Sequence, residues 1–224
     1  MQWLKRLKQH INEYGMAVTL GFALHRMLSR VHPTCGLYWY LFYRQPIQSE
    51  QLLREGGNLT FRWVHSFRPV LGQLPRPIEN IEARFNQNVA CIIAMKQDEL
   101  VACAWFAFGR YVEDEVQCTY RVPTHAVWDF DVYVSPRFRM GRTFARTWQA
   151  ANEGLSERGY KYSLSRISAY NLPSRSAHMR LGAEHIGSAV FLKLGRLQVM
   201  CSSLKPHLHA KLIREEPPEL KFKL

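Results

Sequence analysis

The order of strand and helix patterns between residues 88 and 202 constrains the fold of this chain more than any other feature. The predicted elements are, in order, strands at 88–96, 100–109 and 125–134, a helix at 141–159, a strand at 162–170, a helix at 172–182 and a hairpin at 185–202. We therefore expect a mixed α/β fold with a central, mostly antiparallel sheet and flanking helices. The strand–helix–strand unit at 126–169 should cross over right-handed, which makes its two strands parallel neighbours.

The 224 residues divide by character into three segments. Residues 1–87 form a helical and aromatic N-terminal region that we expect to pack on the core. Residues 88–204 form the core itself, and residues 205–224 form a charged tail that we expect to be loose. The aromatic run within 35–47 consists of strand-forming residue types. It fits the core of the protein, the lining of a site for a long apolar substrate, or a patch that faces a membrane.

The first thirty residues have the pattern of a basic amphipathic helix. Basic side chains lie largely off a face that is formed by Trp3, Leu4, Leu7 and Ile11. Such a helix packs onto its own domain or lies on an anionic membrane, so a peripheral membrane contact through residues 1–43 stays open. We expect neither an export signal nor a membrane-spanning segment, because the apolar runs are too short. The expected location is the cytoplasm, with the inner face of the membrane as the alternative.

The net charge of +12 and the pI of about 9.7 favour an anionic partner: nucleic acid, anionic lipid or a polyanionic cofactor. Nucleic acid is the less favoured partner because no standard recognition motif occurs, although aromatic residues and arginines interleave in 61–69. The five cysteines are far apart and never form a C-x-x-C pair. We therefore expect no disulfide framework and no metal site.

The stretch "VYVSPRFRMGRTFARTW", residues 132–148, places several arginines where a predicted strand meets a predicted helix. The N-terminus of a helix exposes backbone N–H groups and the positive end of its dipole, so an anion such as a phosphate is stabilised there. Arg137, Arg139 and Arg142 add positive charge, and Gly141 permits a close approach of the ligand. The turn is either a solvated surface turn or an anion site. Neither a Walker nor a Rossmann glycine pattern is present.

A second segment, "NLPSRSAHMRLGA" at 171–183, follows the next predicted strand. Together the two segments resemble the GCN5-related N-acetyltransferase (GNAT) family over about residues 88–202. Val134 and Pro136 match that family's V-x-P, Arg139 matches the leading basic residue of its pyrophosphate loop, and Asn171 and Gly182 match the ends of its second motif. The loop departs from the family pattern because Met140, Arg142 and Phe144 replace its usual glycines, and Gly141 lies one place out of step.

The resemblance implies an N-acyltransferase that transfers an acyl group directly from an acyl-CoA, by default acetyl-CoA, to an amine acceptor of unknown identity. It implies that the pantetheine arm lies between two splayed parallel strands and that His178, where many members have tyrosine, protonates the CoA thiolate; the alternative is that His178 only packs the helix. The residues that it assigns to CoA binding are Tyr133, Val134, Arg137, Arg139, Met140, Gly141, Arg142, Thr143, Asn171 and Ser174.

Asp129 and Asp131 are the candidate bases that accept the amine proton. They alternate with apolar residues, which predicts that both lie on one face of the strand. One of them accepts the proton through a water, or both form ion pairs with arginines such as Arg166. Two other functions stay open: a long-chain acyltransferase that uses acyl-CoA or a carrier protein at the membrane surface, and a non-enzymatic nucleic-acid-binding protein.

Overall fold

The computed structural model describes residues 15–48, 58–212 and 215–223. Contacts divide these residues into two compact units. Unit 1 comprises residues up to 45, 112–121 and 166–223, and unit 2 comprises residues 46–111 and 122–165. Strands β5 (Arg110–Glu113) and β8 (Tyr162–Ser168) each continue from one unit into the other along the chain.

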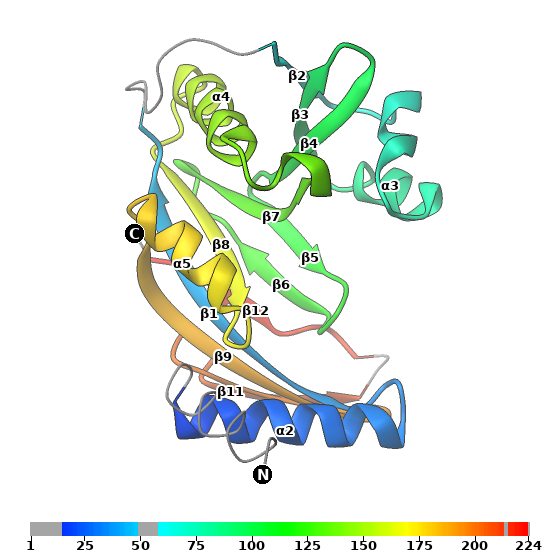
Figure 1. Cartoon of the computed structure of the whole chain (residues 1–224). Coiled ribbons are helices and arrows are strands. Elements are labelled where there is room, and N and C mark those ends of the chain that lie inside the picture. Colours follow the sequence, from blue (N-terminus) through cyan, green and yellow to red (C-terminus); the bar gives the residue numbers. More distant parts are fainter. Residues whose placement is uncertain (1–14, 49–57, 213–214, 224) are drawn as a thin grey trace. The chain divides into compact units, whose positions relative to one another are not determined.

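Unit 2 contains the predicted strand–helix–strand element (Figure 1). Its elements are β2 (Thr60–Val64), the 3-10 helix η1 (Pro69–Gln73), α3 (Ile78–Arg84), β3 (Val89–Lys96), β4 (Glu99–Ala107), β7 (Ala126–Val134), the 3-10 helix η2 (Pro136–Phe138), α4 (Thr143–Glu157) and the start of β8. The strand order is β8-β7-β4-β3-β2. As predicted, β7 and β8 are parallel neighbours, whereas β7–β4, β4–β3 and β3–β2 are antiparallel.

Helix α4 packs on β3 and β4 because one of its faces is apolar. Trp148 lies fully buried on this face, and its ring centroid is 6.0 Å from that of Phe106. Trp63 of β2 also packs against the helix: the ring lies under the Arg158 guanidinium and touches the backbone of Gly154. Trp63 of the 61–69 segment is therefore used in packing rather than being free to stack on a base.

Unit 1 contains the aromatic run of the N-terminal region. Its elements are α2 (Met16–Val31), β1 (Gly36–Pro46, whose last residue belongs to unit 2), β6 (Cys118–Arg121), α5 (Leu172–Arg180), β9 (Glu184–Leu194), β10 (Leu197–Ser202), β11 (Leu208–Leu212) and β12 (Glu219–Lys221). The larger sheet has the order β11-β10-β9-β1-β8, in which β1–β9, β9–β10 and β10–β11 are antiparallel. Phe42 and Tyr43 of β1 are buried, so this part of the aromatic run belongs to the core.

The C-terminal segment is more ordered than we predicted. In place of a loose tail the structure has β11, which pairs with β10, and β12, which pairs in parallel with β6. Leu220 and Phe222 are buried, and Phe222 contacts Phe42 with ring centroids 5.3 Å apart. The prediction was wrong because it weighed the charges and prolines of this segment and overlooked its alternating apolar residues.

The mixed α/β fold with a mostly antiparallel sheet is confirmed. The polar stretch 110–123 holds two short strands, β5 and β6, which form a second sheet with β12 in the order β12-β6-β5. Of the N-terminal helical pattern, residues 1–14 lie outside the described residues, and the remainder forms α2. No helix among the described residues is both long enough and apolar enough to cross a membrane.

Candidate functional site

The basic turn in unit 2 consists of η2 followed by the first turn of α4. The amides of Phe138, Arg139 and Gly141 donate to the carbonyl groups three residues earlier, at N···O distances of 2.8, 3.5 and 3.3 Å. These three amides are therefore used inside the turn. A Cβ atom at Gly141 would meet only the Phe138 carbonyl oxygen, at 3.6 Å, so the fold does not require glycine at this position.

The N-terminus of α4 lies at the end of this turn and has the properties of an anion site. The N-cap residue is Arg142, and among the described residues no side chain accepts a hydrogen bond from the first-turn amides. The first turn also contains no acidic residue. The first amides of an α-helix have no partner within the helix, and the helix dipole adds positive potential there. An anion bound at Thr143 would be stabilised by both.

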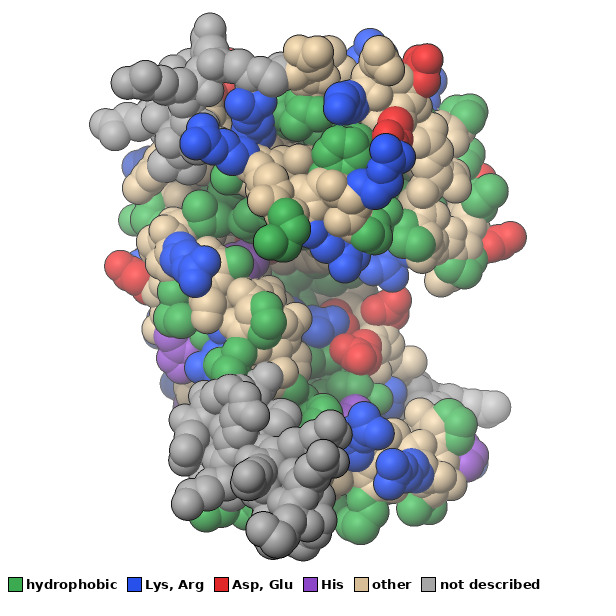
Figure 2. Space-filling view, in the orientation of Figure 1, with side chains coloured by type: hydrophobic (Ala, Val, Ile, Leu, Met, Phe, Trp, Pro, Cys, Tyr) green, Lys and Arg blue, Asp and Glu red, His purple; other side chains and the backbone are tan. Residues whose placement is uncertain are grey.

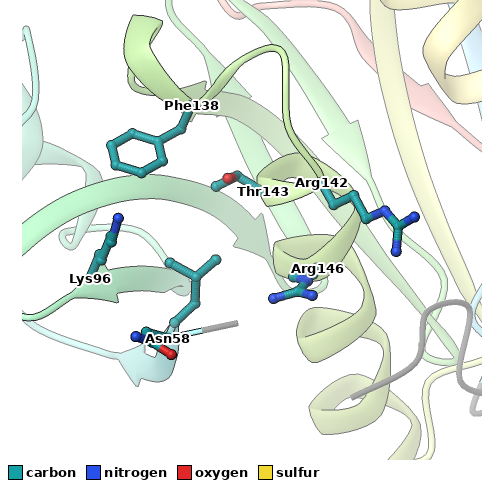
Figure 3. Close-up of a pocket in the computed structure, with 7 residues that line it drawn as sticks. Asn58, Lys96, Phe138, Arg142, Thr143 and Arg146 are labelled. Carbon is teal, nitrogen blue, oxygen red and sulfur yellow. The ribbon is translucent and has the colours of Figure 1, made fainter. Parts of the chain in front are cut away.

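A pocket of about 300 Å³ opens beside this helix N-terminus (Figure 3). The residues that line it are Asn58, Leu59, Lys96, Phe138, Arg142, Thr143 and Arg146. Lys96 points toward the Phe138 ring, over which its ammonium nitrogen lies 5.5 Å from the centroid, whereas the Arg142 guanidinium points away from that ring. The pocket thus combines three cationic side chains, two amide or hydroxyl side chains and two apolar ones.

The arginines of the turn differ in how far they are already occupied. Arg139 donates through Nε to the Val134 carbonyl at 3.0 Å, and Arg137 is exposed and only loosely paired with Glu99 at 3.8 Å. Within the described ranges, neither Arg142 nor Arg146 forms an ion pair. These last two guanidinium groups are therefore the ones available to a bound anion.

Our sequence analysis named Arg142 and Thr143 but missed Arg146, Lys96 and Asn58. Arg146 could have been found, because residues four apart lie on the same side of a helix. Lys96 and Asn58 could not, because Lys96 ends β3 and Asn58 lies two residues before β2, and the sequence does not reveal the register of these two strands.

Strand β7 directs the Val134 amide, rather than the Tyr133 amide, away from β4. The Ser135 amide donates to the Val101 carbonyl of the β4 strand at 2.8 Å. Because successive amides of a strand point to opposite edges, the Val134 amide points to the other edge. Along that edge β7 pairs with β8 over Ala126–Asp129, and β7 itself continues to Val134. The Val134 amide is therefore better oriented than the Tyr133 amide to donate a hydrogen bond to a ligand at that edge.

A bulge in β7 overturns the prediction that Asp129 and Asp131 share one face. The register between β4 and β7 shifts at this point, and Asp131 adopts a φ of 60°, in the left-handed region. Asp129 lies opposite Phe106, whereas Asp131 pairs with Arg84, whose guanidinium stacks on Trp105. Since neighbouring residues 105 and 106 of a strand point to opposite faces, the two aspartates do so as well. The alternation of residue types alone could not show this extra residue.

The two carboxyl groups also differ in charge environment. Both oxygens of Asp131 form ion pairs, with Arg76 at 2.5 Å and with Arg84 at 2.6 Å. Asp129 is buried, and its carboxylate accepts a hydrogen bond from the Ser163 hydroxyl at 2.7 Å. Burial raises the pKa of Asp129 to about 7, against a smaller lowering by the Ser163 hydrogen bond. Asp129 is thus the carboxyl group that changes protonation near neutral pH.

The remaining predicted residues belong to α5 of unit 1. Asn171 caps this helix, because its Oδ1 accepts a hydrogen bond from the Ser174 amide at 3.2 Å. His178 is buried, and burial lowers its pKa to about 4, so the imidazole is neutral at pH 7. A cap and a buried ring each have a structural role, and their part in CoA binding or proton transfer stays a prediction.

Unit 1 also contains a charged cluster that our sequence analysis did not identify. Arg166 donates to Glu113 at 2.5 Å, lies 3.3 Å from Glu115, and stacks on the Tyr40 ring with its central carbon 4.2 Å from the centroid. The Tyr40 hydroxyl donates to Glu115. Burial raises the pKa of Glu113, and Arg166 acts in the opposite direction. Arg166, which we had considered as a partner for the two aspartates, is therefore paired with glutamates.

No family model matches the sequence, and no curated protein matches it either. Among solved structures, the chain is similar to a conserved protein of unknown function from Staphylococcus epidermidis, with 10% identity, a TM-score of 0.52, and coverage of 86% of this chain and 81% of that one. An acetyltransferase assigned to the GNAT family from Novosphingobium aromaticivorans matches with 11% identity and a TM-score of 0.48, over 69% of this chain and 62% of that one.

An aminoglycoside N-acetyltransferase in complex with CoA matches with 19% identity and a TM-score of 0.42, over 55% of this chain and 90% of that one. At these identities the similarity concerns the fold alone. No group of three or more potential metal ligands occurs within the part of the chain that the structure describes.

Proposed function

We propose that this protein is an acyl-CoA-dependent N-acyltransferase, with acetyl-CoA as the default donor. The observation that carries the proposal is the pocket at the N-terminus of α4. The first-turn amides have no side-chain cap there, and Arg142 and Arg146 have no carboxylate partner within the described ranges. Phosphate oxygens accept hydrogen bonds from both kinds of donor, so the pyrophosphate of CoA suits this pocket. The resemblance of Val134 and Pro136 to the V-x-P, and of Arg139 to the leading basic residue of the pyrophosphate loop, supports the same assignment.

The reaction would proceed by direct transfer. The nitrogen of a neutral amine attacks the thioester carbonyl carbon, a C–N bond forms, and the C–S bond breaks. The amine loses one proton to a base, and the CoA sulfur takes up one proton. The outward-pointing Val134 amide is suited to donate a hydrogen bond to the oxyanion. Asp129, acting through a water, suits the role of base because its pKa of about 7 lies close to the working pH.

His178 would donate the proton to the CoA thiolate in this reaction. A ring with a pKa of about 4 is almost never an imidazolium at pH 7. The role therefore requires that the bound substrate raise that pKa. If the pH profile of kcat in His178→Gln matches that of the wild type, His178 has only a packing role.

The test of the proposal is a thermal-shift titration with CoA, acetyl-CoA and a long-chain acyl-CoA. A ligand that binds only the folded chain raises its apparent stability. We expect Arg142→Ala/Arg146→Ala to raise the Kd for CoA by about tenfold or more, because each charge-assisted hydrogen bond contributes about 1.5–3 kcal/mol. The control Arg62→Ala/Arg68→Ala removes the same charge from exposed positions of unit 2 outside the pocket and should bind CoA like the wild type.

Two outcomes contradict the proposal at different levels. If no CoA compound shifts the melting temperature at roughly millimolar concentration, the protein is not a CoA-dependent enzyme. If CoA binds equally well to the wild type and to Arg142→Ala/Arg146→Ala, the pyrophosphate binds elsewhere. A shift that appears only with the long-chain acyl-CoA would identify the donor as a fatty acyl group.

A further inference from the structure

Helix α2 uses only one of its faces to pack against its own unit. A Cβ atom at Gly21 would lie 3.6 Å from both Leu37 and Trp39 of β1, so the helix backbone lies directly on that strand. Phe22 contacts Tyr170 with ring centroids 5.3 Å apart. This packing accounts for the buried face of α2 and leaves the opposite face uncovered by these elements.

The outer face of α2 is apolar along its whole length, which is unusual for a surface helix. Its large side chains are Met16, Leu20, Leu24, Met27 and Val31, and all but Leu24 are more than half exposed, Val31 at 77%. Their spacing of four, four, three and four residues places them on one stripe, about 22 Å long. Ala17 and Ala23 are also exposed. A contiguous exposed stripe of this kind indicates a surface that contacts another apolar phase.

The charged residues beside the stripe indicate which kind of partner it contacts. Arg26 and Arg30 are exposed and four residues apart, so they form one edge of the stripe. No aspartate or glutamate occurs between Gly15 and Gln48. A second copy of α2 would bring arginines against arginines. The fourteen residues before Gly15 lie outside the described residues, and by sequence they carry three basic residues and one acidic one. Neither occupant complements the arginine edge.

We propose that α2 lies in the interface of an anionic lipid bilayer. The Met16–Val31 stripe enters the boundary between headgroups and acyl chains, and Arg26 and Arg30 bind lipid phosphates. Figure 2 shows basic and apolar side chains together over the end of α2 that leads into β1, where the grey atoms leave it visible. The inference concerns unit 1 alone and does not depend on the proposed transferase activity.

The experiment is co-sedimentation of the full chain with vesicles of phosphatidylcholine alone, or of phosphatidylcholine mixed with phosphatidylglycerol. We expect the wild type to bind the anionic vesicles at least about tenfold more tightly than the neutral ones, since both arginines contribute. Leu20→Glu and Met27→Glu should each abolish binding. Arg26→Gln/Arg30→Gln should remove the preference for the anionic vesicles. The matched control is Ile78→Glu, at an exposed apolar position of unit 2, which should bind like the wild type.

Several results would overturn the inference. One is a wild type that stays unbound with both kinds of vesicle, and another is a Leu20→Glu variant that sediments as the wild type does. A dimer on size-exclusion chromatography that Leu20→Glu converts to a monomer, without vesicle binding, would assign the stripe to a second copy. If both Leu20→Glu and Met27→Glu lower the melting temperature strongly and the wild type does not bind vesicles, the stripe instead packs against a segment of the same chain.

Discussion

Two aspartates in β7, only two positions apart, have opposite electrostatic environments. Asp131 forms ion pairs with two guanidinium groups, those of Arg76 and Arg84. Asp129 has a hydroxyl partner but no cation among its hydrogen-bond partners, so burial favours its protonated form. The bulge at Asp131 separates the two side chains onto different faces. One inserted residue thus separates an ion-paired aspartate from an aspartate that titrates near neutrality.

Asp129 should make the protein less stable as the pH rises from about 4 to about 7. Its pKa is about 7 in the folded state and about 3.8 when unfolded, so in this range the folded state binds more protons. Asp129 contributes fully to the free energy of unfolding below about pH 4. This contribution, about 4 kcal/mol, is lost as the pH rises to about 7. Asp129→Asn stays neutral and should not show this fall, so it should be more stable than the wild type above pH 7. Urea unfolding across this range measures the difference.

Asp131→Asn is the matched control, and it should change stability in the opposite direction. Asparagine tolerates the left-handed backbone at this position, so the substitution removes only the charge. At pH 7 it should destabilise the fold, because Arg76 and Arg84 lose their shared partner. Equal pH dependence in Asp129→Asn and the wild type would show that Asp129 is ionised throughout.

At the scale of elements, α4 is held against the sheet of unit 2 through an unusually close contact. The Trp63 indole of β2 lies on Gly154, where a Cβ atom would come within 2.5 Å of the indole nitrogen. The same indole contacts Phe106 and lies under the Arg158 guanidinium. The close approach fixes α4, and therefore the helix N-terminus that lines the pocket.

Gly154→Ala should destabilise the protein by about 1–3 kcal/mol, the usual cost of overpacking. In a solvated helix the same change would stabilise by up to about 1 kcal/mol. The sign of the effect therefore reports the Trp63 contact. Gly72→Ala in η1, where a Cβ atom would meet nothing within 4 Å, should change stability by less than about 0.5 kcal/mol. Chemical denaturation of both variants decides the question, and a stabilised Gly154→Ala would contradict the packing argument.

The sequence predicted the elements that are defined by local patterns, and it failed where structure depends on distant partners. The strand, turn and helix around the basic turn follow from apolar periodicity and from Ser135-Pro136. Three things do not follow from such patterns: the bulge at Asp131, the direction of the Val134 amide, and the contribution of Lys96 to the pocket. Each depends on register against another strand. Strand β12 also depends on a distant partner. The Cys118 thiol donates a hydrogen bond to the carbonyl of Pro218, directly before β12, and these two residues are 100 positions apart in the sequence.

On the scale of the whole molecule, unit 1 is completed by its last strand. Leu220 of this strand is buried. In addition, the Thr119 amide donates a hydrogen bond to the Pro218 carbonyl at 2.8 Å, and Arg121 forms an ion pair with Glu219 at 2.9 Å. The core of unit 1 therefore includes side chains from both the start and the end of the described chain.

Leu220→Ala should lower the free energy of unfolding by about 2–5 kcal/mol, because it removes a fully buried side chain and leaves a cavity. The neighbouring control Lys221→Ala loses only an exposed ion pair at 3.8 Å and should stay within about 1 kcal/mol of the wild type. Thermal and urea unfolding report both. A wild-type-like Leu220→Ala would mean that β12 does not contribute to the stability of the unit.

Unit 1 is built from chain segments that precede and follow unit 2, and this affects how the protein folds during synthesis on the ribosome. Tyr43 in β1 is translated 132 positions before Arg175, its hydrogen-bond partner, and the whole of unit 2 is translated in between. At cellular elongation rates that interval lasts on the order of ten seconds. Throughout it, the aromatic segment of β1 lacks the strand β9 with which it pairs. Nascent chains of this protein should therefore depend on chaperones that shield this one early segment until translation has passed β9.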